Sequence, residues 1–453
     1  MKYAGAPLSE VPCTDRITTR DHDRIGQADL ILFWFLILNV FVIRYLRTAV
    51  PLFEVFSFKA WIDWILLAYV LARLVSTRFK LSGGVYIASL ILVIVVSINL
   101  AVFGFNGLAA STLITILSPL SLFAFFAYLR RSHNDEAFAR LSRQVRTILN
   151  CFFLLNTPII YMQIATGSFL MGPFLAINPT VFDQMDGLIG LNGVPVLNFV
   201  WIATILFNVE RSLSEKRPGP AALAACQFAV ITHISIFNDN KMMGLTFATV
   251  GFGYVIVRLT RNGSLAKGLL KKLTFAGAGL SALLALFSAG VSGTSGSVAN
   301  VLQLFWYSAG SVPDPNNERG MLNYLAFSKY GAAGLGSGLA TIDPNDRSIH
   351  WHLGINSASL LLIQGGIFFL FAVILLYASA AYAIVRWGGG FGLPIFLSVF
   401  AIVVMSAYAS QPFEDQYLVI CLCLIFLLFS LAGADKELRV KPIGRAREAG
   451  HDR

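Results

Sequence analysis

The feature that most limits what this chain can fold into is a series of uninterrupted apolar stretches, each about 18–22 residues long. Because an α-helix rises 1.5 Å per residue, about 20 residues cross the roughly 30 Å hydrocarbon core of a bilayer. The stretches lack the alternation typical of a membrane β-barrel, and a helix satisfies its own backbone hydrogen bonds in lipid. We therefore predict an all-α, polytopic helical membrane protein with about 12 transmembrane helices. The spans are expected at residues 29–46, 60–77, 84–103, 108–129, 147–166, 188–209, 220–237, 241–259, 273–290, 358–385, 391–409 and 416–433.

Composition supports this class. Of the 453 residues, 56% are hydrophobic and only 13% are charged, whereas soluble globular domains carry about 25% charged residues. The first 28 residues are polar and contain several arginines, so we expect no cleavable signal peptide. The first span is then expected to act as its own insertion signal.

The positions of the basic residues predict the orientation. With the N-terminus in the cytoplasm, all but seven of the 34 Lys and Arg residues fall on the cytoplasmic side, as the positive-inside rule requires. The seven on the outer side are Arg44, Arg47, Lys59, Lys241, Arg319, Lys329 and Arg347. We expect Arg44 to snorkel from a helix end, and Arg47 and Lys59 to flank the first external loop. The sequence thus predicts a membrane protein with both termini cytoplasmic.

The net charge of +10 is then mainly a topology signal, with some attraction to anionic lipid. Nucleic acid is not an expected partner, because the basic residues are spread over separate short loops. The expected organisation is a cytoplasmic tail (1–28), transmembrane helices 1–9 (29–290), a large loop on the outer side of the membrane (291–357), transmembrane helices 10–12 (358–433) and a basic cytoplasmic tail (434–453).

Two external connections are long. Residues 167–187 contain no Lys or Arg and are expected to form a lipid-facing or lid-like segment. The loop 291–357 is large enough to contain short helices, and the apolar spacing of 297–310 and 318–331 predicts two of them at the membrane surface. They are followed by "GAAGLGSGLA" (331–340), a glycine-rich turn that would let the backbone approach a ligand closely.

The external loop collects cations that membrane insertion does not require. Arg319, Lys329 and Arg347 all lie there, which indicates binding of an external anion. A phosphate group is the natural candidate, since Arg binds it with two hydrogen bonds and Lys as a point charge. Lys241 begins a span just after Asp239, so an ion pair at the helix end is the alternative to ligand binding there.

Two histidines, His350 and His352, follow the "DPNDR" sequence in the same loop. A metal site is not expected, because the neighbouring Asp343 and Asp346 have Arg347 as a partner and no HExxH motif is present. A general base is the sharper hypothesis, since imidazole titrates near neutral pH. A solvated or structural histidine is the alternative. The two aspartates either orient a histidine or sugar hydroxyl or form turns.

Together these features resemble the bacterial O-antigen polymerase and O-antigen ligase superfamily. The resemblance covers about residues 190–430. It rests on the number of spans, the long loop with an arginine that opens a helix ("ERGMLNYLAF", Arg319), and the glycine-rich segment. In addition, "NSASLLLIQGGIFF" (356–369) is similar to the family's His-Asn-x-x-Leu…Glu-x-Gly element, and "FNDNKMMGL" is similar to its Ser-Arg element, with Lys241 at the Arg position.

The chain departs from the family pattern at two positions. The family histidine directly precedes the asparagine, whereas Asn356 follows Ile355, and His352 lies one helical turn upstream. Gln364 replaces the family's glutamate. We favour His352 over His350 as the catalytic residue.

The resemblance implies transfer of a glycan from undecaprenyl diphosphate to an acceptor hydroxyl on the periplasmic face, without a metal, a cofactor or a nucleotide sugar. In this scheme Arg319 and Lys241 bind the diphosphate, Arg347 and Lys329 support it, and His352 activates the acceptor. The expected partners are the undecaprenyl-diphosphate-linked oligosaccharide and membrane lipid, with other polysaccharide-assembly membrane proteins as candidates.

Three functions fit this pattern. A polymerase would join repeat units of O-antigen, capsule or exopolysaccharide, and a ligase would transfer the glycan to the lipid A core of lipopolysaccharide. We favour the polymerase because the family's motifs diverge most among polymerases and are diverged here. A transporter or flippase of the lipid-linked oligosaccharide is the third possibility, with Asp63, Arg73 and His233 as its intramembrane candidates. The charge-rich external loop favours surface chemistry over transport.

Overall fold

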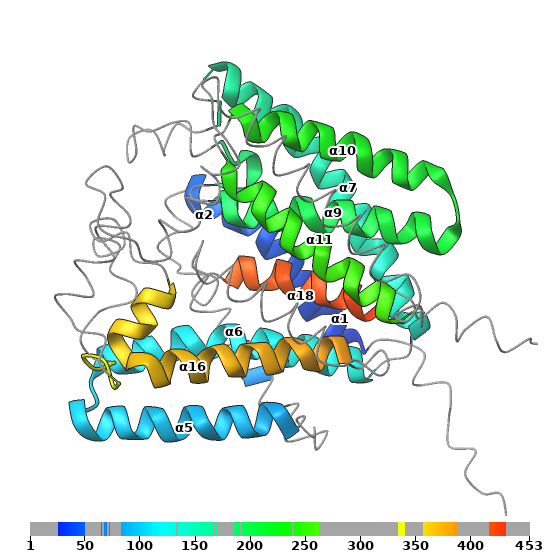
Figure 1. The fold of residues 1–453 in the computed structure, drawn as a ribbon. Coiled ribbons are helices and arrows are strands. Elements are labelled where there is room, and N and C mark those ends of the chain that lie inside the picture. Colours follow the sequence, from blue (N-terminus) through cyan, green and yellow to red (C-terminus); the bar gives the residue numbers. More distant parts are fainter. Residues whose placement is uncertain are drawn as a thin grey trace, which may run out of the picture.

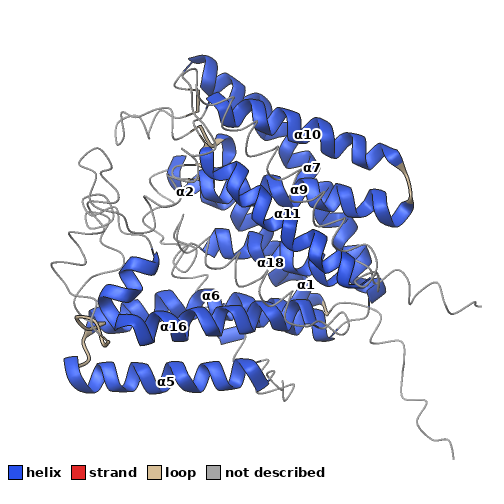
Figure 2. Ribbon diagram, viewed as in Figure 1, coloured by secondary structure: helices blue, strands red, loops and turns tan. Residues whose placement is uncertain are grey.

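The computed structural model describes residues 26–49, 65, 68–69, 72, 83–132, 135–166, 169–170, 185–190, 193–237, 240–261, 334–339, 357–386 and 416–431. In these parts the chain is helical and contains no β-strand (Figures 1 and 2). Seven helices there are long and apolar enough to cross a membrane by length and composition. The prediction of an all-α membrane protein is therefore confirmed, although not the full number of spans.

The helices that coincide with predicted spans begin and end as follows: α1 (Gln27–Leu38), continued by η2 (Asn39–Ile43) and α2 (Arg44–Ala49); α5 (Gly83–Phe103); α6 (Gly107–Ser132); α7 (Asp135–Thr166); α9 (Val194–Glu215); α10 (Pro218–Phe237); α11 (Lys241–Arg261); α16 (Ser357–Arg386); and α18 (Gln416–Leu431). The predicted spans 273–290 and 391–409 lie outside the described residues, as does most of 60–77.

Two boundaries differ from the prediction. The span expected at 188–209 begins only at Val194, because Gly190 has a positive φ of 82° that ends the short 3-10 helix η4 (Gly187–Ile189) before it. Helix α7 begins at Asp135 instead of 147. Its charged first turns are amphipathic, and the apolar side chains Ala137, Phe138, Leu141 and Val145 are buried on one face.

The first membrane helix contains a stretch of π-helix. Between α1 and α2, residues Asn39–Ile43 form η2, and the N–H of Arg44 donates to the carbonyl of Asn39. The π-helical turn inserts one extra residue per turn and changes the face that the following residues present. As a result Asn39 and Arg44, one π-helical turn apart, are both buried.

Helix α18 lies at the centre of the bundle. It packs against α6, α9 and α16, and its residues 416–430 are all buried. Helix α5 packs on α16 at one edge, whereas α10 packs on α9 at the other (Figure 1). Helix α6 contains Pro119, which has no N–H to donate. Helix α6 is also hydrogen-bonded to α16, because the hydroxyl of Tyr377 donates to the carbonyl of Ile116 at 3.0 Å.

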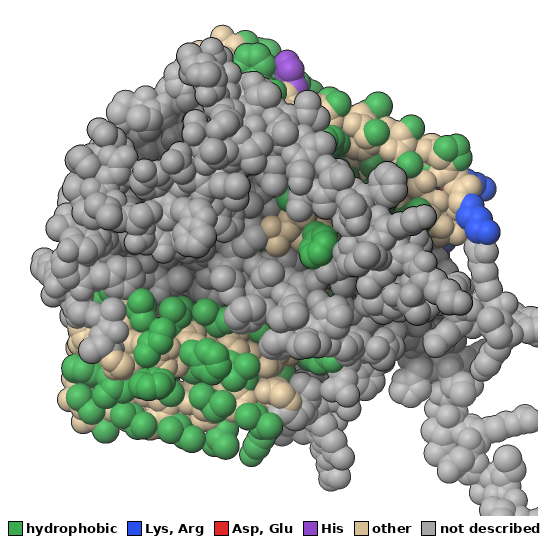
Figure 3. All heavy atoms as spheres, viewed as in Figure 1, with side chains coloured by type: hydrophobic (Ala, Val, Ile, Leu, Met, Phe, Trp, Pro, Cys, Tyr) green, Lys and Arg blue, Asp and Glu red, His purple; other side chains and the backbone are tan. Residues whose placement is uncertain are grey.

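The outer surface of the bundle is apolar as well. Helix α5 exposes Tyr86, Ile87, Leu90 and Val93, and Figure 3 shows hydrophobic side chains covering this face. A water-soluble protein rarely exposes such a continuous patch, whereas lipid is a suitable solvent for it.

The connections separate into two ends, as an up-and-down topology requires. The α5–α6 connection and the turn at 334–339 lie at one end, on the left of Figure 1, and the α9–α10 connection lies at the other. The charge distribution predicts that the first end faces the periplasm, and we call it the outer end.

Candidate functional site

Most of the predicted site residues fall where the structure is not described. Arg319, Lys329, Arg347, His350 and His352 lie outside the described residues. The two helices predicted within the same loop also lie outside them. The structure instead shows how the described segments next to these residues are held at the outer end.

The glycine-rich turn at 334–339 is inserted into a break in helix α16. Gly366 has φ 73° and ψ −175°, which interrupts the helix, and Figure 1 shows the part before the break turning away from the rest. The backbone N–H of Ser337 donates to the carbonyl of Ile363 at 2.8 Å, and that of Gly338 donates to Gln364 at 2.9 Å. These two carbonyls, which would accept from N–H groups of α16 in a continuous helix, therefore accept from N–H groups of the turn.

The glycines in this turn permit contact between backbones. Gly336 has φ +68°, and a Cβ there would lie 2.5 Å from the carbonyl oxygen of Ile363. A Cβ on Gly366 would lie 2.2 Å from the carbonyl oxygen of Gly334. The backbone of this turn therefore approaches α16 closely, and its approach to a ligand stays a prediction.

Polar side chains from two further helices complete the attachment. Asn99 on α5 donates to the carbonyl of Leu335 at 2.9 Å and accepts from the N–H of Leu339 at 3.1 Å. Thr112 on α6 donates to the carbonyl of Leu339 at 3.2 Å. Gln364, the residue at the family's glutamate position, donates to the hydroxyl of Thr112 at 3.3 Å. We call residues 334–339 with these three side chains the glycine-turn anchor.

Replacing Asn99 by alanine is expected to destabilise the protein by about 2–5 kcal/mol, because the N–H of Leu339 and the carbonyl of Leu335 would each lose a buried partner. The thermal unfolding midpoint in detergent measures this effect. Ser97→Ala is the matched control, since Ser97 lies on the exposed face of the same helix. Equal midpoints for the two variants would show that the anchor contributes nothing.

The anchor limits the possible positions of Arg347, His350 and His352. Residues 340–356 connect Leu339 in the anchor to Ser357, the first residue of α16. An extended chain spans at most about 3.6 Å per residue, so the Cα of His352 lies within about 18 Å of Ser357, and that of Arg347 within about 29 Å of Leu339. The limit on His352 is shorter than the thickness of the hydrocarbon core, about 30 Å, whereas the limit on Arg347 is about equal to that thickness.

Lys241 begins a helix, as predicted. It is the first residue of α11, and its side chain lies outside the described part of the structure. The preceding residue, Asn240, forms a reciprocal amide pair with Asn198 on α9: one Nδ2 to Oδ1 distance is 2.7 Å and the other is 3.2 Å. Because both amides are buried, this pair fixes the start of α11 against the first turns of α9.

A second segment, residues 185–190 with the short 3-10 helix η4, is also inserted at the outer end. The N–H of Leu188 donates to Asn156 Oδ1 at 2.6 Å, and the N–H of Gly187 donates to Gln163 Oε1 at 2.9 Å, both on α7. Asp186 accepts from the N–H of Gly193 at 2.6 Å, just before α9. The loop 167–187 was expected to be lipid-facing or lid-like. Its final residues 185–187 are buried against α7, which corrects that expectation for this part.

Arg44 does not snorkel to the membrane surface, contrary to the prediction. Its side chain is buried, with 8% exposure, and its guanidinium carbon lies 4.9 Å from the ring centroid of Tyr417 on α18. The π-helical turn before Arg44 explains the error, because it rotates this residue towards the bundle. The aromatic ring offers an attractive face to the cation.

His233, one of the intramembrane candidates for transport, has a partner in the structure. Its Nδ1 lies 2.9 Å from the hydroxyl of Tyr161 on α7. The side chain is exposed at the edge of the bundle instead of facing its interior. Asp63 and Arg73, the other intramembrane candidates for transport, lie outside the described residues.

The amides that hold the outer end together were not predicted from the sequence. Asn99, Asn156 and Asn198 each lie within or beside a predicted apolar span, where an amide is costly unless it is hydrogen-bonded. That cost is the signal that would have identified them. Comparison of the chain with protein-family models, curated proteins and solved structures gives no match.

Proposed function

We propose that this protein polymerises undecaprenyl-diphosphate-linked oligosaccharide repeat units by glycan transfer at the periplasmic face of the inner membrane. The observation that supports the proposal is the attachment of residues 340–356, which contain Arg347, His350 and His352, at both ends to the outer end of the bundle. Catalytic side chains need a scaffold that limits their positions, and the glycine-turn anchor provides one.

The proposed reaction is a displacement at the anomeric carbon of the donor sugar. The acceptor hydroxyl loses its proton to His352, its oxygen forms a bond to the anomeric carbon, and the bond from that carbon to the diphosphate breaks. Undecaprenyl diphosphate leaves with the electron pair. Its growing negative charge is stabilised by Arg319 and Lys241. Arg347 and Lys329, in the same loop as Arg319, support the binding of the diphosphate. This scheme uses neither a metal nor a cofactor.

The acceptor distinguishes a polymerase from a ligase. We expect cells that lack the protein to carry single repeat units on their lipid A core, or to lose long-chain capsule or exopolysaccharide. A core without any repeat unit, together with long lipid-linked chains that accumulate, would identify a ligase instead. Purified protein in proteoliposomes with the lipid-linked oligosaccharide as the sole substrate tests the same point, because only a polymerase lengthens chains there.

Transport is the second candidate, and the interrupted helices favour it. Helix α16 is broken at Gly366 and the first membrane helix contains η2, and interrupted helices occur at the binding sites of transporters. The exposed position of His233 argues against its use in a pathway through the bundle. A transporter requires Asp63→Ala or His233→Ala to abolish translocation of a labelled lipid-linked oligosaccharide while Arg319→Ala leaves it intact.

A further inference from the structure

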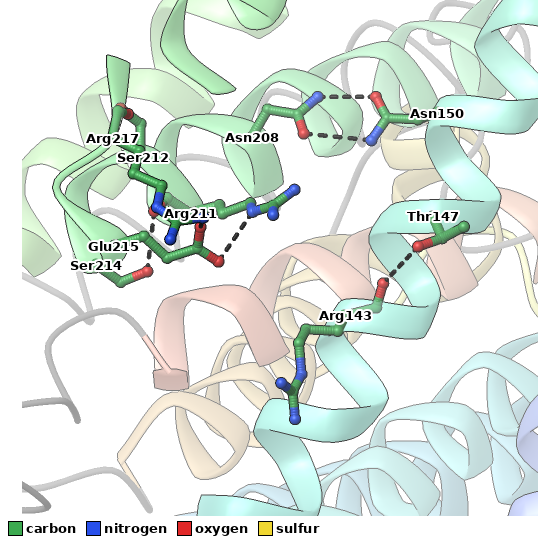
Figure 4. Close-up of polar contacts among 9 residues, drawn as sticks. All are labelled: Arg143, Thr147, Asn150, Asn208, Arg211, Ser212, Ser214, Glu215 and Arg217. Carbon is green, nitrogen blue, oxygen red and sulfur yellow. Dashed lines mark hydrogen bonds and ion pairs between the residues drawn. The ribbon is translucent and has the colours of Figure 1, made fainter. Parts of the chain in front are cut away.

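Several arginines gather at the end of the bundle opposite the proposed catalytic site. Arg143 and Arg146 lie in the first half of α7, and Arg211 lies near the end of α9. The α9–α10 connection adds Lys216 and Arg217, and Figure 3 shows basic side chains at this position. Figure 4 shows Arg143 on α7 and the end of α9 with Arg211 on the neighbouring helix. We call these five residues the arginine cluster.

The cluster has more positive than negative charge. The guanidinium of Arg146 is half-buried and is subject to the charges of Arg211, Glu215 and Arg143. Glu215 is already bonded to Arg211, with Oε1 2.9 Å from Nε, and its other oxygen lies 3.9 Å from Arg217. Within the described residues no carboxylate forms an ion pair with Arg143 or Arg146. The positive-inside rule explains the sign of these charges but not the position of Arg146 within reach of the charges of both Arg143 and Arg211.

Buried amides fix the two helices beside the cluster. Asn150, one turn after Arg146, and Asn208, one turn before Arg211, form a reciprocal pair at 2.8 and 3.2 Å, drawn in Figure 4. Gln227 on α10 donates to Asn150 at 2.7 Å and accepts from Asn208 at 2.9 Å. The arginines therefore project from turns whose spacing is already fixed. Binding of an anion then costs little backbone conformational entropy.

The depth of the cluster matches the level of phospholipid headgroups. The 20 residues of α7 after Arg146 reach its end at Thr166 and are enough to cross the hydrocarbon core. Arg143 lies at one end of an exposed stripe on α7. Thr147, Cys151 and Leu154 form the rest of this stripe at helical spacing. A single face of α7 thus presents cations at the membrane surface and a lipid-exposed stripe above them.

We propose that the arginine cluster binds the phosphodiester headgroup of an anionic phospholipid, whose acyl chains lie along the exposed stripe of α7. Guanidinium groups bind phosphate oxygens in pairs of hydrogen bonds, and basic sites between membrane helices on the cytoplasmic side suit such headgroups. The proposal does not depend on the glycan-transfer function, since the cluster lies at the other end of the bundle.

Native mass spectrometry of the full-length protein in a non-ionic detergent, titrated with cardiolipin or phosphatidylcholine, tests the proposal. We expect cardiolipin to bind in preference to phosphatidylcholine. Arg146→Gln should weaken cardiolipin binding about fivefold to tenfold, and Arg146→Lys should weaken it less. Arg386→Gln removes the same charge at the end of α16 and is the control, with an expected change below about twofold.

Three outcomes would overturn the proposal: equal binding of the two lipids by the wild type, equal losses for Arg146→Gln and Arg386→Gln, or displacement of cardiolipin by millimolar inorganic phosphate, which would indicate a site for a free anion. Arg143→Gln repeats the test at an exposed position if Arg146→Gln does not yield folded protein. There too, unchanged cardiolipin binding contradicts the proposal.

Discussion

Replacing Arg319 by alanine is expected to lower the rate of glycan transfer by about two to three orders of magnitude. The departing diphosphate gains negative charge as its bond to the sugar breaks, and a guanidinium stabilises that charge through two parallel hydrogen bonds. Because this interaction strengthens in the transition state, kcat should fall more than KM rises. The measurement is the initial rate of chain growth in proteoliposomes that contain the lipid-diphosphate oligosaccharide.

Two further variants make this result specific. Arg319→Lys keeps the charge but loses the paired hydrogen bonds, so we expect an intermediate rate. Arg386→Ala removes a positive charge at the opposite end of the bundle and should leave chain growth unchanged. A normal rate for Arg319→Ala, with protein that elutes as a single folded species, would remove Arg319 from the proposed mechanism.

Replacing Gly336 by alanine should destabilise the protein strongly, by about 2–5 kcal/mol from backbone strain and steric overlap together. At φ +68° a side chain is strained, and its Cβ would lie 2.5 Å from the carbonyl oxygen of Ile363 and 2.6 Å from the N of Gly366. Neither backbone atom can move without opening the attachment of the turn to α16. The thermal unfolding midpoint and the protease resistance of the purified protein measure the loss.

Gly107→Ala and Gly251→Ala are the matched controls for Gly336→Ala. A Cβ at either position meets nothing within 4 Å, and neither residue has a positive φ. Both changes should leave the midpoint unchanged or raise it slightly, because alanine favours helix more than glycine does. If Gly336→Ala unfolds at the same temperature as these controls, the turn does not pack into the break of α16 as described.

Apolar length alone was enough to predict most described helices. Residues 84–103 were expected as a span, and α5 runs from Gly83 to Phe103. The prediction fails where a local feature overrides hydrophobicity. Gly190 and Pro195 delay the start of α9. The π-helical turn at η2 buries Arg44, and no apolar pattern indicates such a turn.

The candidate site could be predicted only in part. The glycines of "GAAGLGSGLA" indicated a close approach of the backbone. The structure shows that this backbone packs against helix α16, which follows the turn in the sequence after residues 340–356. Asn99 is 236 residues away from Leu335, the residue whose carbonyl it binds. Contacts over such separations depend on how the helices pack, which sequence periodicity does not specify. The roles of Arg319 and His352 rest on charge and resemblance.

The most direct measurement of the central claim is the side of the membrane on which the loop 291–357 lies. Single cysteines at Ser348 and at Arg217, each in a background without the five native cysteines, are treated with a membrane-impermeant maleimide in cells whose outer membrane alone is permeable. We expect Ser348→Cys to react in these intact cells and Arg217→Cys to react only after lysis. Labelling of Arg217→Cys from outside, with Ser348→Cys protected until lysis, would place the loop in the cytosol and contradict the proposed periplasmic reaction.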